Sequence, residues 1–555
     1  MIRDKLAQLV IESINDAIQI GEILIPRVPE VVLERPKEKA YGDWSTNVAM
    51  VLASQAKADP LKLAEIIASH LRQQRQFLKE IRVVPPGFIN FFISDEWLQK
   101  ALMEIEKQGP KFGYSDIGKG EKIQVEFVSA NPTGPMHIGH GRWAAVGDAL
   151  ANVLAAAGYR VEREFYINDY GTQMDLFGAS VSARYAQIFG VDEVVPEGGY
   201  HGAYVKEIGQ EIVEKEGNKY LKLSRPERAR LFRERAEKQV LEHFEKVLEA
   251  FGVHFDKWFS EEELHDSGVV AQAVEELRKK GHVYEKDGAV WLRTTTFGDD
   301  KDRVLIRENG EPTYFAADVA YHKNKLERGF KKIINVWGAD HHGYVGRVKA
   351  AVQALGYPAD QVEIIIGQLV NLYRRGEQVR MSKRTGEMVT FEELLEEVGR
   401  DVARYIFLTR STDSPLDFDI ELAKEQSQEN PVYYVQYAHA RISSILEFAR
   451  EKGVPIPAPG EADTFLLKHE SELELIRKLL EFQEMVEDCA RFRAPFKLTR
   501  YAEDLAALFH VFYTQCRVVT ENKELSQARL SLVKATKIVL KNVLGLLGVS
   551  APEKM

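Results

Sequence analysis

The segment Phe127–His140 most constrains what this chain can fold into, because an apolar run meets two histidines and a glycine there. Residues 122–128 alternate and are rich in β-branched and aromatic side chains, which predicts a buried strand. Residues 131–135 (NPTGP) break that strand, and the Ala- and Leu-rich run 141–157 predicts a helix. The sequence therefore predicts a strand, a turn and a helix, with both histidines in or just before the first helical turn.

The first turn of that helix is suited to binding an anion. Its unpaired backbone N–H groups and the positive end of the helix dipole favour a phosphate chain. His137 and His140 add hydrogen-bond donors, and Gly139, which has no Cβ, lets a base or ribose approach the backbone closely. Alternatively, one histidine caps the helix and the other is an ordinary core or surface residue, because a motif this short has many chance matches.

A basic loop near the far end of the same region makes a nucleotide site more specific. Residues 379–386 (VRMSKRTG) follow an apolar run at 362–372 and precede Thr390–Glu393, which has the pattern of a capping box. Such a charged loop is usually a solvated surface. Its pairing with His-x-Gly-His is nevertheless far more specific than either segment alone.

Together these two segments resemble the HIGH and KMSK signatures of class I aminoacyl-tRNA synthetases. Nearly the whole chain is similar to the arginyl-tRNA synthetases of the bacterial type. The segments that carry this similarity are Tyr41–Ala49, Gly87–Phe91, Glu126–His140, Tyr166–Gln173, Tyr314–Asp318, Trp337–His342 and Leu547–Met555. Many members have a degraded KMSK loop, whereas here Met-Ser-Lys is intact and preceded by Arg380.

The order of elements and the resemblance predict three domains. Residues 1–115 are expected to form a small N-terminal α/β domain that contacts tRNA. Strands alternate with helices over 116–420, which indicates a Rossmann-like α/β catalytic domain with a parallel sheet, interrupted by a charged helical insertion at about 180–290. Helical periodicity over 421–555 predicts an all-α bundle, which the resemblance makes the anticodon-binding domain.

Composition argues against several classes of function. The 555 residues carry 84 acidic and 74 basic side chains, a formal charge of −10, which argues against a non-specific polyanion binder. Residues 491–555 hold eleven basic and five acidic residues, so they form either a phosphate-contacting face or an ordinary solvated helix surface. Cys489 and Cys516 show no disulfide or zinc pattern, which favours a cytoplasmic setting. No apolar run is long enough to span a bilayer, and the acidic first helix excludes a signal peptide.

The resemblance implies a two-step reaction. ATP, accompanied by Mg²⁺ as its substrate complex, converts L-arginine into arginyl-adenylate with release of pyrophosphate, and tRNA(Arg) then accepts the arginyl group with release of AMP. His137 and His140 would bind the α-phosphate region, and Lys383 would neutralise the departing pyrophosphate. The catalytic and ATP-binding residues that the resemblance implies are His137, Gly139, His140, Met381, Ser382 and Lys383.

Carboxylates should select arginine, because a guanidinium presents a planar fork of donors that two acidic side chains can saturate. The arginine-binding residues that the resemblance implies are Glu126, Asn131, His140, Tyr314, Asp318 and His342. Tyr314 and Asp318 could instead be an ordinary helical pair four residues apart. His341 and His342 do not indicate a metal, since no third ligand is suitably spaced, and no protein-bound metal is expected. A wrong amino acid would leave carboxylates unpaired, so no editing domain is expected.

For the tRNA, the resemblance implies contacts from Asn47, Phe88 and Asn90 to the D-loop corner and from the bundle to the anticodon. Tyr437 is a candidate for stacking on an unpaired base and an equally good core residue. A monomer is expected. Three alternatives stay open: a synthetase for another amino acid such as lysine or glutamine, an adenylyltransferase that uses no RNA, and an inactive RNA-binding paralogue.

Overall fold

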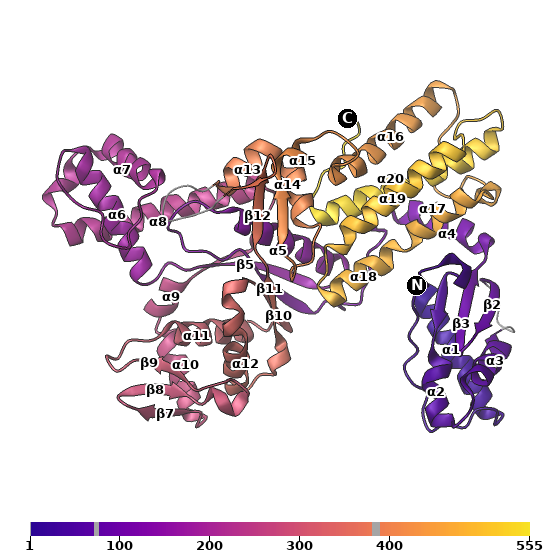
Figure 1. Cartoon of the computed structure of the whole chain (residues 1–555), viewed down its shortest axis with the longest axis horizontal. Helices are drawn as coiled ribbons and strands as arrows, with labels where there is room; N and C mark the ends of the chain where they lie inside the picture. The colour runs from indigo at the N-terminus through magenta and orange to yellow at the C-terminus, as the bar shows by residue number, and fades with distance from the viewer. Residues whose placement is uncertain (1, 72–76, 380–388) are drawn as a thin grey trace.

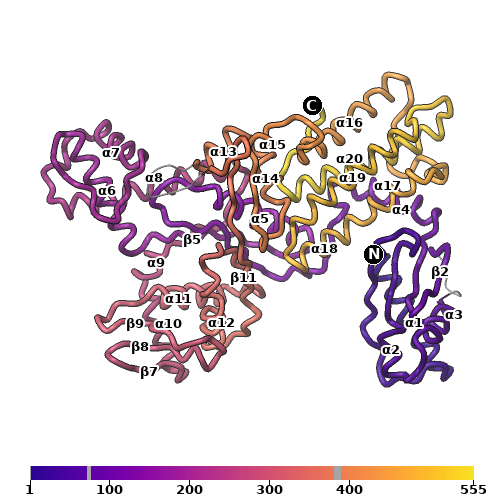
Figure 2. Tube along the Cα trace, in the orientation of Figure 1, coloured from indigo at the N-terminus to yellow at the C-terminus, as the bar shows by residue number. Residues whose placement is uncertain are grey.

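The computed structural model describes residues 2–71, 77–379 and 389–555. Figure 1 shows an elongated molecule in which an N-terminal unit lies beneath one end of a C-terminal helical bundle, and a sheet lies in the middle. The same path is followed as a tube in Figure 2. A parallel-sheet centre, a small N-terminal unit and a helical C-terminal part confirm the predicted fold class.

The centre is a five-stranded parallel sheet in the order β11-β10-β4-β5-β6. These strands are β4 (Lys122–Glu126), β5 (Arg160–Ile167), β6 (Lys257–Ser260), β10 (Lys332–Gly338) and β11 (Val362–Gly367). Strand β4 lies between β5, which follows it in the chain, and β10, which pairs with its other edge. The strand order therefore reverses at β4. Ligands of open α/β sheets bind beyond the carboxyl ends of the strands at such a reversal.

Strand β4 ends two residues earlier than predicted because the backbone turns there. Val128 and Ser129 have φ values of 70° and 34°, a left-handed conformation that is uncommon for residues other than glycine and especially for a β-branched side chain. The chain then enters α5 (Ile138–Ala156), which begins three residues before the predicted start because His137 is its N-cap residue. The strand, the turn and the helix follow the predicted order.

Helix α5 packs unusually closely on its neighbours. A Cβ added to Gly147 would lie 2.1 Å from the ring of Phe127, and one added to Gly141 would lie 2.3 Å from the ring of Phe391 on α13 (Phe391–Val398). Glycine at these two positions therefore fixes the distance from α5 to the end of β4 and to the start of α13.

The predicted insertion at about 180–290 is two excursions from the sheet, because β6 returns to the sheet inside it. Strand β6 has four residues, of which one is buried, so its pattern is too short to recognise. The first excursion contains α6 (Thr172–Ile188), α7 (Ala203–Glu216) and α8 (Arg225–Ala250). The second contains α9 (Glu261–Asp266), α10 (Val269–Lys279), β7 (Val283–Lys286), β8 (Ala289–Leu292), β9 (Arg303–Ile306) and α11 (Tyr314–Glu327), and α12 (Val345–Ala354) follows β10.

The N-terminal unit covers an antiparallel sheet of order β1-β3-β2 with helices. Its elements are α1 (Ile2–Gln19), β1 (Trp44–Thr46), α2 (Val48–Ala56), α3 (Pro60–Leu71), β2 (Leu78–Val84), β3 (Phe88–Ile93) and α4 (Asp95–Gln108). Ion pairs join it to the bundle: Arg3 contacts Asp488 at 3.2 Å, and Arg35 contacts Glu484 at 2.9 Å. Helix α4 also packs against the bundle.

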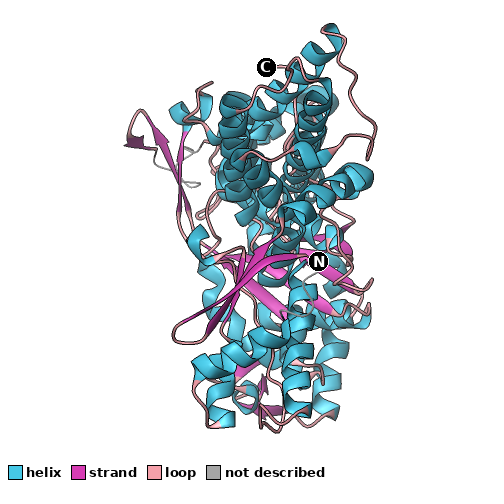
Figure 3. Cartoon of the chain, turned by 90° about the vertical axis from the view of Figure 1, so that its right-hand side faces the viewer, coloured by secondary structure: helices cyan, strands magenta, loops and turns pink. Residues whose placement is uncertain are grey.

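The C-terminal part is helical, as predicted, and Figure 3 shows helices gathered around the C-terminus. The predicted helix at 466–489 is two helices that break at Glu481. None of the helices in the described ranges is long and apolar enough to cross a membrane. The elements after β11 are β12 (Val370–Arg374), β13 (Glu377–Gln378), α13, α14 (Arg400–Phe407), β14 (Leu416–Asp419), α15 (Ile420–Lys424), α16 (Pro431–Glu451), α17 (Glu470–Leu480), α18 (Phe482–Phe492), α19 (Lys497–Gln515) and α20 (Lys523–Leu547).

One buried guanidinium ties the bundle to the sheet. Arg404 on α14 is fully buried and donates to the carbonyl oxygen of Leu547 at the end of α20 (3.0 Å) and to that of Phe251 after α8 (3.1 Å). It also pairs with Asp148 on α5 at 2.5 Å. Burial lowers the pKa of Arg404, and the Asp148 carboxylate opposes that shift. Four segments that are distant in the sequence therefore meet at one side chain.

Replacing this arginine should destabilise the whole molecule. We expect Arg404→Met to lower the free energy of unfolding by about 3–5 kcal/mol, because it removes the buried cation beside the Asp148 carboxylate and leaves buried carbonyl groups without their donor. The exposed pair of Glu96 and Lys100 provides the control, since Glu96→Gln should change stability by less than about 0.5 kcal/mol. Calorimetric melting of both variants measures the difference, and equal melting temperatures would contradict the expectation.

Candidate active site

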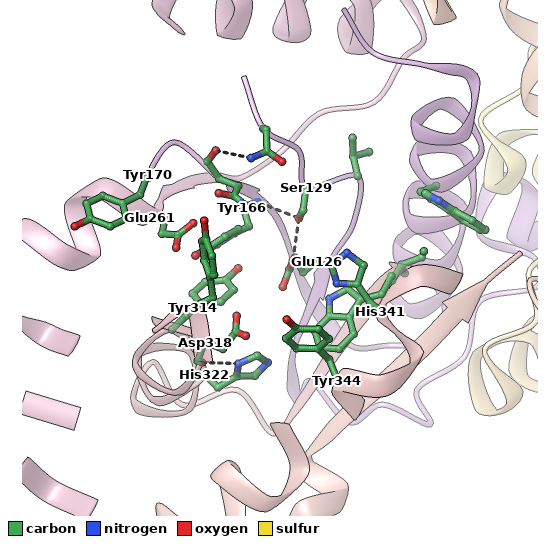
Figure 4. Close-up of a pocket in the computed structure, with 18 of the residues that line it drawn as sticks. Glu126, Ser129, Tyr166, Tyr170, Glu261, Tyr314, Asp318, His322, His341 and Tyr344 are labelled. Carbon is green, nitrogen blue, oxygen red and sulfur yellow. Dashed lines mark hydrogen bonds between the residues drawn. The ribbon is translucent and has the colours of Figure 1, made fainter. Parts of the chain in front are cut away.

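A cavity of about 390 Å³ lies beyond the carboxyl ends of β4, β5, β6 and β10. Its walls come from the turns after these strands and from α11. Figure 4 shows Glu126 and Asp318 between Tyr314 on one side and His341 and Tyr344 on the other. This position at the reversal of strand order is where the fold places ligands.

Three carboxyl groups line this cavity. Glu126 and Glu261 are 4% and 3% exposed. Burial and then the charge of Glu126 raise the pKa of Asp318 to about 7. Burial and then the charge of Asp318 raise the pKa of Glu261 to about 8, although a hydrogen bond from Tyr166 opposes this shift. The cavity concentrates negative charge and therefore suits a cationic group.

The three carboxyl groups differ in their partners. Glu126 is paired with Lys325, whose ammonium lies 2.5 Å from Oε2, and the Ser129 hydroxyl donates to Oε1 at 2.9 Å. Within the described residues no Lys or Arg forms a salt bridge with Asp318 or Glu261. Besides the hydrogen bond from Tyr166, Glu261 has the His265 ring, whose Nε2 lies 3.9 Å from its Oε1. Asp318 and Glu261 therefore have the greater need of an external cation.

A second cavity of about 640 Å³ adjoins the first and shares part of its wall. His137, Gly139 and His140 line it. The two imidazole rings stack with their centroids 3.7 Å apart, and the backbone N–H of His137 donates to Nδ1 of His140 at 3.2 Å. A Cβ on Gly139 would lie 2.9 Å from the ring of His137, so glycine preserves this stacked arrangement.

The predicted loop with Met381, Ser382 and Lys383 lies outside the described residues, but both of its flanks are described. Before it, the N–H of Val379 donates to the carbonyl of Leu372 at 2.8 Å. After it, Thr390 forms a β-bridge with His137 and opens α13 with the predicted capping box. The segment that follows the predicted loop therefore adjoins the N-terminus of α5, although the two are far apart in the sequence.

The other predicted arginine-binding residues differ in which cavity they line. Tyr314 and Asp318 lie on α11 and line the first cavity, and Asn131 lines both cavities. His342 is exposed and lines neither cavity, whereas His341 lines both. Successive side chains point about 120° apart on a 3₁₀ helix such as η5 (Ala339–Tyr344), so adjacent histidines cannot face one site. The described residues contain no group of three or more His, Cys, Asp or Glu arranged to hold a metal.

Glu261 could not be found from the sequence as a cavity residue. It is the first residue of α9 and follows β6 directly, and the short β6 had no recognisable strand pattern. One local signal was present: Ser260 followed by three glutamates is the pattern of a helix start, and the Ser260 hydroxyl accepts from the N–H of Glu263 at 3.1 Å. A helix start after an apolar pair could have marked the end of a strand.

The candidate tRNA contacts in the N-terminal unit differ in exposure. Asn47 is exposed at the start of α2, and Phe88 is 38% exposed at the start of β3. Asn90 is buried, 2% exposed, and its side-chain oxygen accepts from the Ser45 hydroxyl at 2.7 Å. Asn47 and Phe88 are therefore available to a partner, whereas Asn90 joins two strands.

The aromatic candidate in the bundle belongs to a cluster. Tyr437 is half-buried on α16, and its ring stacks on that of Tyr433 with centroids 6.3 Å apart. It also stacks on the ring of His510 from α19 at 6.0 Å. Arg441 donates to its hydroxyl at 3.1 Å. The ring is thus part of a partly exposed row of aromatic side chains between two helices.

Family models and known proteins match the chain from end to end. The matching models are "Arginyl tRNA synthetase N terminal domain" (residues 4–93), "tRNA synthetases class I (R), catalytic domain" (100–430) and "DALR anticodon binding domain" (435–555). The chain is 50% identical over 551 residues to the arginine–tRNA ligase of Moorella thermoacetica, which covers 99% of this chain and 98% of that protein. It is 49% identical over 558 residues to that of Heliobacterium modesticaldum, covering 100% and 99%. The solved Thermus thermophilus arginyl-tRNA synthetase shares the fold, with a TM-score of 0.77, 24% identity and complete coverage of both chains.

The raised pKa values of the cavity predict a pH dependence of cation binding. We expect the affinity for L-arginine to rise with pH across about 6 to 9, because the cation requires Asp318 and Glu261 to be ionised and their pKa values are about 7 and about 8. Calorimetric titration in buffers of different ionisation enthalpy should detect proton release on binding. Asp318→Asn should reduce that release, whereas Glu96→Gln should not.

The same groups should affect the ligand-free fold in the opposite sense. Their pKa values lie above the ordinary values of about 3.9 for Asp and 4.3 for Glu, so the folded state binds protons more tightly than the unfolded state. Their contribution to stability is therefore present at low pH and is lost as pH rises through about 7 and about 8. A melting temperature of Asp318→Asn that falls as steeply as that of the wild type would contradict this.

Proposed function

The chain belongs to the arginyl-tRNA synthetase family, and we propose that it ligates L-arginine to tRNA(Arg) with ATP. The reaction runs through arginyl-adenylate and releases pyrophosphate and then AMP. A cavity lined by three carboxyl groups, two of them on buried residues, beside a second cavity lined by His137 and His140, is the observation that best supports this function.

The guanidinium of arginine is proposed to lie against Asp318 and Glu261, with Glu126 behind them and Tyr314 at the entrance. Charge-assisted hydrogen bonds to a planar fork of donors favour a guanidinium over other cations. Tyr314 is 53% exposed and lines the cavity, which suits a side chain that covers a bound substrate. A substrate amino acid with a neutral side chain, bound in place of arginine, would leave carboxylates buried without a partner. This penalty is the basis for rejecting wrong amino acids.

The other end of arginine is proposed to lie at the boundary of the two cavities. Asn131 lines both, so its amide is suited to hold the α-amino and carboxylate groups together with His140. His341 also lines both cavities and takes the role that the resemblance implied for His342. The arginine carboxylate then faces the space where an α-phosphate would lie.

ATP is proposed to occupy the second cavity, with Mg²⁺ entering as part of the substrate complex. The carboxylate oxygen of arginine forms a bond to the α-phosphorus while the bond to the pyrophosphate oxygen breaks. His137 and His140 stabilise the charge on the α-phosphate, and Gly139 leaves room for the adenosine. Met381, Ser382 and Lys383 belong to the loop that returns to His137 at Thr390, and Lys383 is proposed to neutralise the pyrophosphate.

The tRNA is proposed to contact the two ends of the chain. A division into residues 1–115, 116–420 and 421–555 gives one domain to the D-loop corner, one to catalysis and one to the anticodon. Asn47 and Phe88 supply exposed contacts in the first domain, with Asn90 holding the strand beneath them. Tyr437 belongs to the aromatic row suited to unpaired bases. We further propose a cytoplasmic monomer.

Charging of tRNA with labelled arginine tests the function directly. ATP–pyrophosphate exchange with arginine, lysine and glutamine, with and without tRNA, tests the amino acid. We expect turnover with arginine only. Exchange with lysine and none with arginine would overturn the proposal, and activity without any tRNA binding would favour an adenylyltransferase.

A histidine variant tests the proposed α-phosphate contact. We expect His140→Ala to lower kcat for charging by about 10²- to 10³-fold, because it removes a donor aimed at charge that develops in the transition state. The KM for tRNA should change little. His201→Ala, which replaces an exposed histidine outside both cavities, is the control. Equal kcat values for the two variants would exclude the assigned role.

A further inference from the structure

Lys325 lies behind the wall of the first cavity, where it contacts the lining residue Glu126, and has no role in the reaction as described above. It is on α11 and is fully buried, with 0% of its side chain exposed. Its ammonium lies 4.1 Å from the centre of the Tyr321 ring. Burying an ammonium is unfavourable unless it is paired and hydrogen-bonded.

The partners of Lys325 come from two adjacent strands. The ammonium donates to Oε2 of Glu126 on β4 at 2.5 Å and to Oδ1 of Asn335 on β10 at 3.0 Å. Glu126 and Asn335 are directly paired in the register of these two parallel strands. One ammonium on α11 thus links the helix to both strands at the point where the strand order reverses.

The directions of the hydrogen bonds around Lys325 follow from its chemistry. An ammonium can only donate, so the side-chain oxygen of Asn335 accepts and its amide nitrogen is left to donate. That nitrogen lies 3.0 Å from Nε2 of His322, which must therefore accept. The ring proton of His322 is then on Nδ1, which donates to the carbonyl oxygen of Asp318 at 2.8 Å.

The protonation of His322 agrees with this chain of bonds. Burial and then the charge of Lys325 lower the pKa of His322 to about 3, so the ring is neutral at physiological pH. A neutral ring can accept at one nitrogen and donate at the other, as the chain requires. Lys325 therefore acts on both carboxylate-bearing segments: on Glu126 directly, and on the backbone of Asp318 through Asn335 and His322.

We propose that Lys325 is a positioning residue for arginine binding, which rests on the proposed function. Its ammonium holds the Glu126 carboxylate in place, and through Asn335 it fixes the tautomer of His322 and the turn of α11 that carries Asp318. It also leaves Asp318 and Glu261 as the carboxylates that receive the substrate cation. Without Lys325, the space beside Glu126 accepts a foreign ammonium, so discrimination against lysine weakens.

Steady-state kinetics of Lys325→Met test this role. We expect the KM for arginine to rise by about 10- to 100-fold, the range of a lost hydrogen-bonded charge, while the KM for ATP changes by less than about 3-fold. Propylammonium should restore part of the arginine affinity, and the ratio of kcat/KM for arginine to that for lysine should fall. Lys323→Met, on the same helix but paired at the surface with Glu327 and Glu276, is the matched control.

A second variant, Asn335→Asp, tests the same role if Lys325→Met does not fold. Asn335→Asp has nearly the same shape and still accepts from Lys325, but it cannot donate to His322. A purely structural role of the ion pair predicts no loss of arginine affinity in this variant, whereas the positioning role predicts a higher KM for arginine with an unchanged KM for ATP.

The outcomes separate this inference from the proposed function. Wild-type enzyme that does not charge tRNA with arginine overturns both. The role of Lys325 alone is overturned if the wild-type enzyme charges tRNA and the variants keep a KM for arginine within about 3-fold of normal. It is also overturned if the KM for arginine rises in parallel with the KM for ATP. Folding of each variant is checked by its melting temperature.

Discussion

Negative charge held inside a cavity is the constraint on which the rest of the site depends. Burial and the charge of Glu126 raise the pKa of Asp318, and burial and the charge of Asp318 raise the pKa of Glu261, so ionising both groups within this cavity is electrostatically unfavourable at neutral pH. Among the residues that the structure describes, one of the three carboxyl groups, that of Glu126, forms a salt bridge with a basic side chain, Lys325. A guanidinium relieves the remaining repulsion and satisfies the acceptors, whereas an uncharged side chain does neither. Selectivity for the amino acid therefore follows from an incomplete internal pairing of charges.

Such a site needs a rigid frame, because displacement of either carboxylate would let water screen it. Helix α5 supplies part of this frame: Gly147 and Gly141 let it lie against Phe127 and Phe391. Arg404 supplies another part by joining α5 to the ends of α8 and α20. From α8 the chain runs through β6 to Glu261 at the start of α9, and α5 carries His140, so the same guanidinium contacts elements that lead to both cavities. The frame also reaches the bundle that the family uses to bind the anticodon.

How much the sequence could predict depended on how local each interaction is. The turn before His137 and the capping box at Thr390 are set by neighbouring residues, and both were predicted correctly. Glu261 and Lys325 were not found, because their importance comes from strands and helices that meet only in the fold. The burial of single residues could not be predicted from residue type either. Asparagine is usually exposed, whereas Asn90 is buried and accepts a hydrogen bond from Ser45 on the neighbouring strand. The family resemblance connected the two distant motifs where periodicity alone could not, and the β-bridge between His137 and Thr390 shows that the segment after the second motif reaches the first motif.

The two adjoining cavities have opposite electrostatic character, which supports the proposed orientation of the amino acid. The second cavity lies at the N-terminus of α5, whose dipole and histidines favour an anion. The first is lined by carboxylates and favours a cation. An arginine molecule is positive at its guanidinium and negative at its carboxylate, so both ends gain when the guanidinium lies in the first cavity and the carboxylate points toward the second. The reverse orientation would bring like charges together at both ends. The field in the two cavities therefore favours the proposed alignment of the attacking carboxylate with the α-phosphate, which is the alignment that the reaction requires.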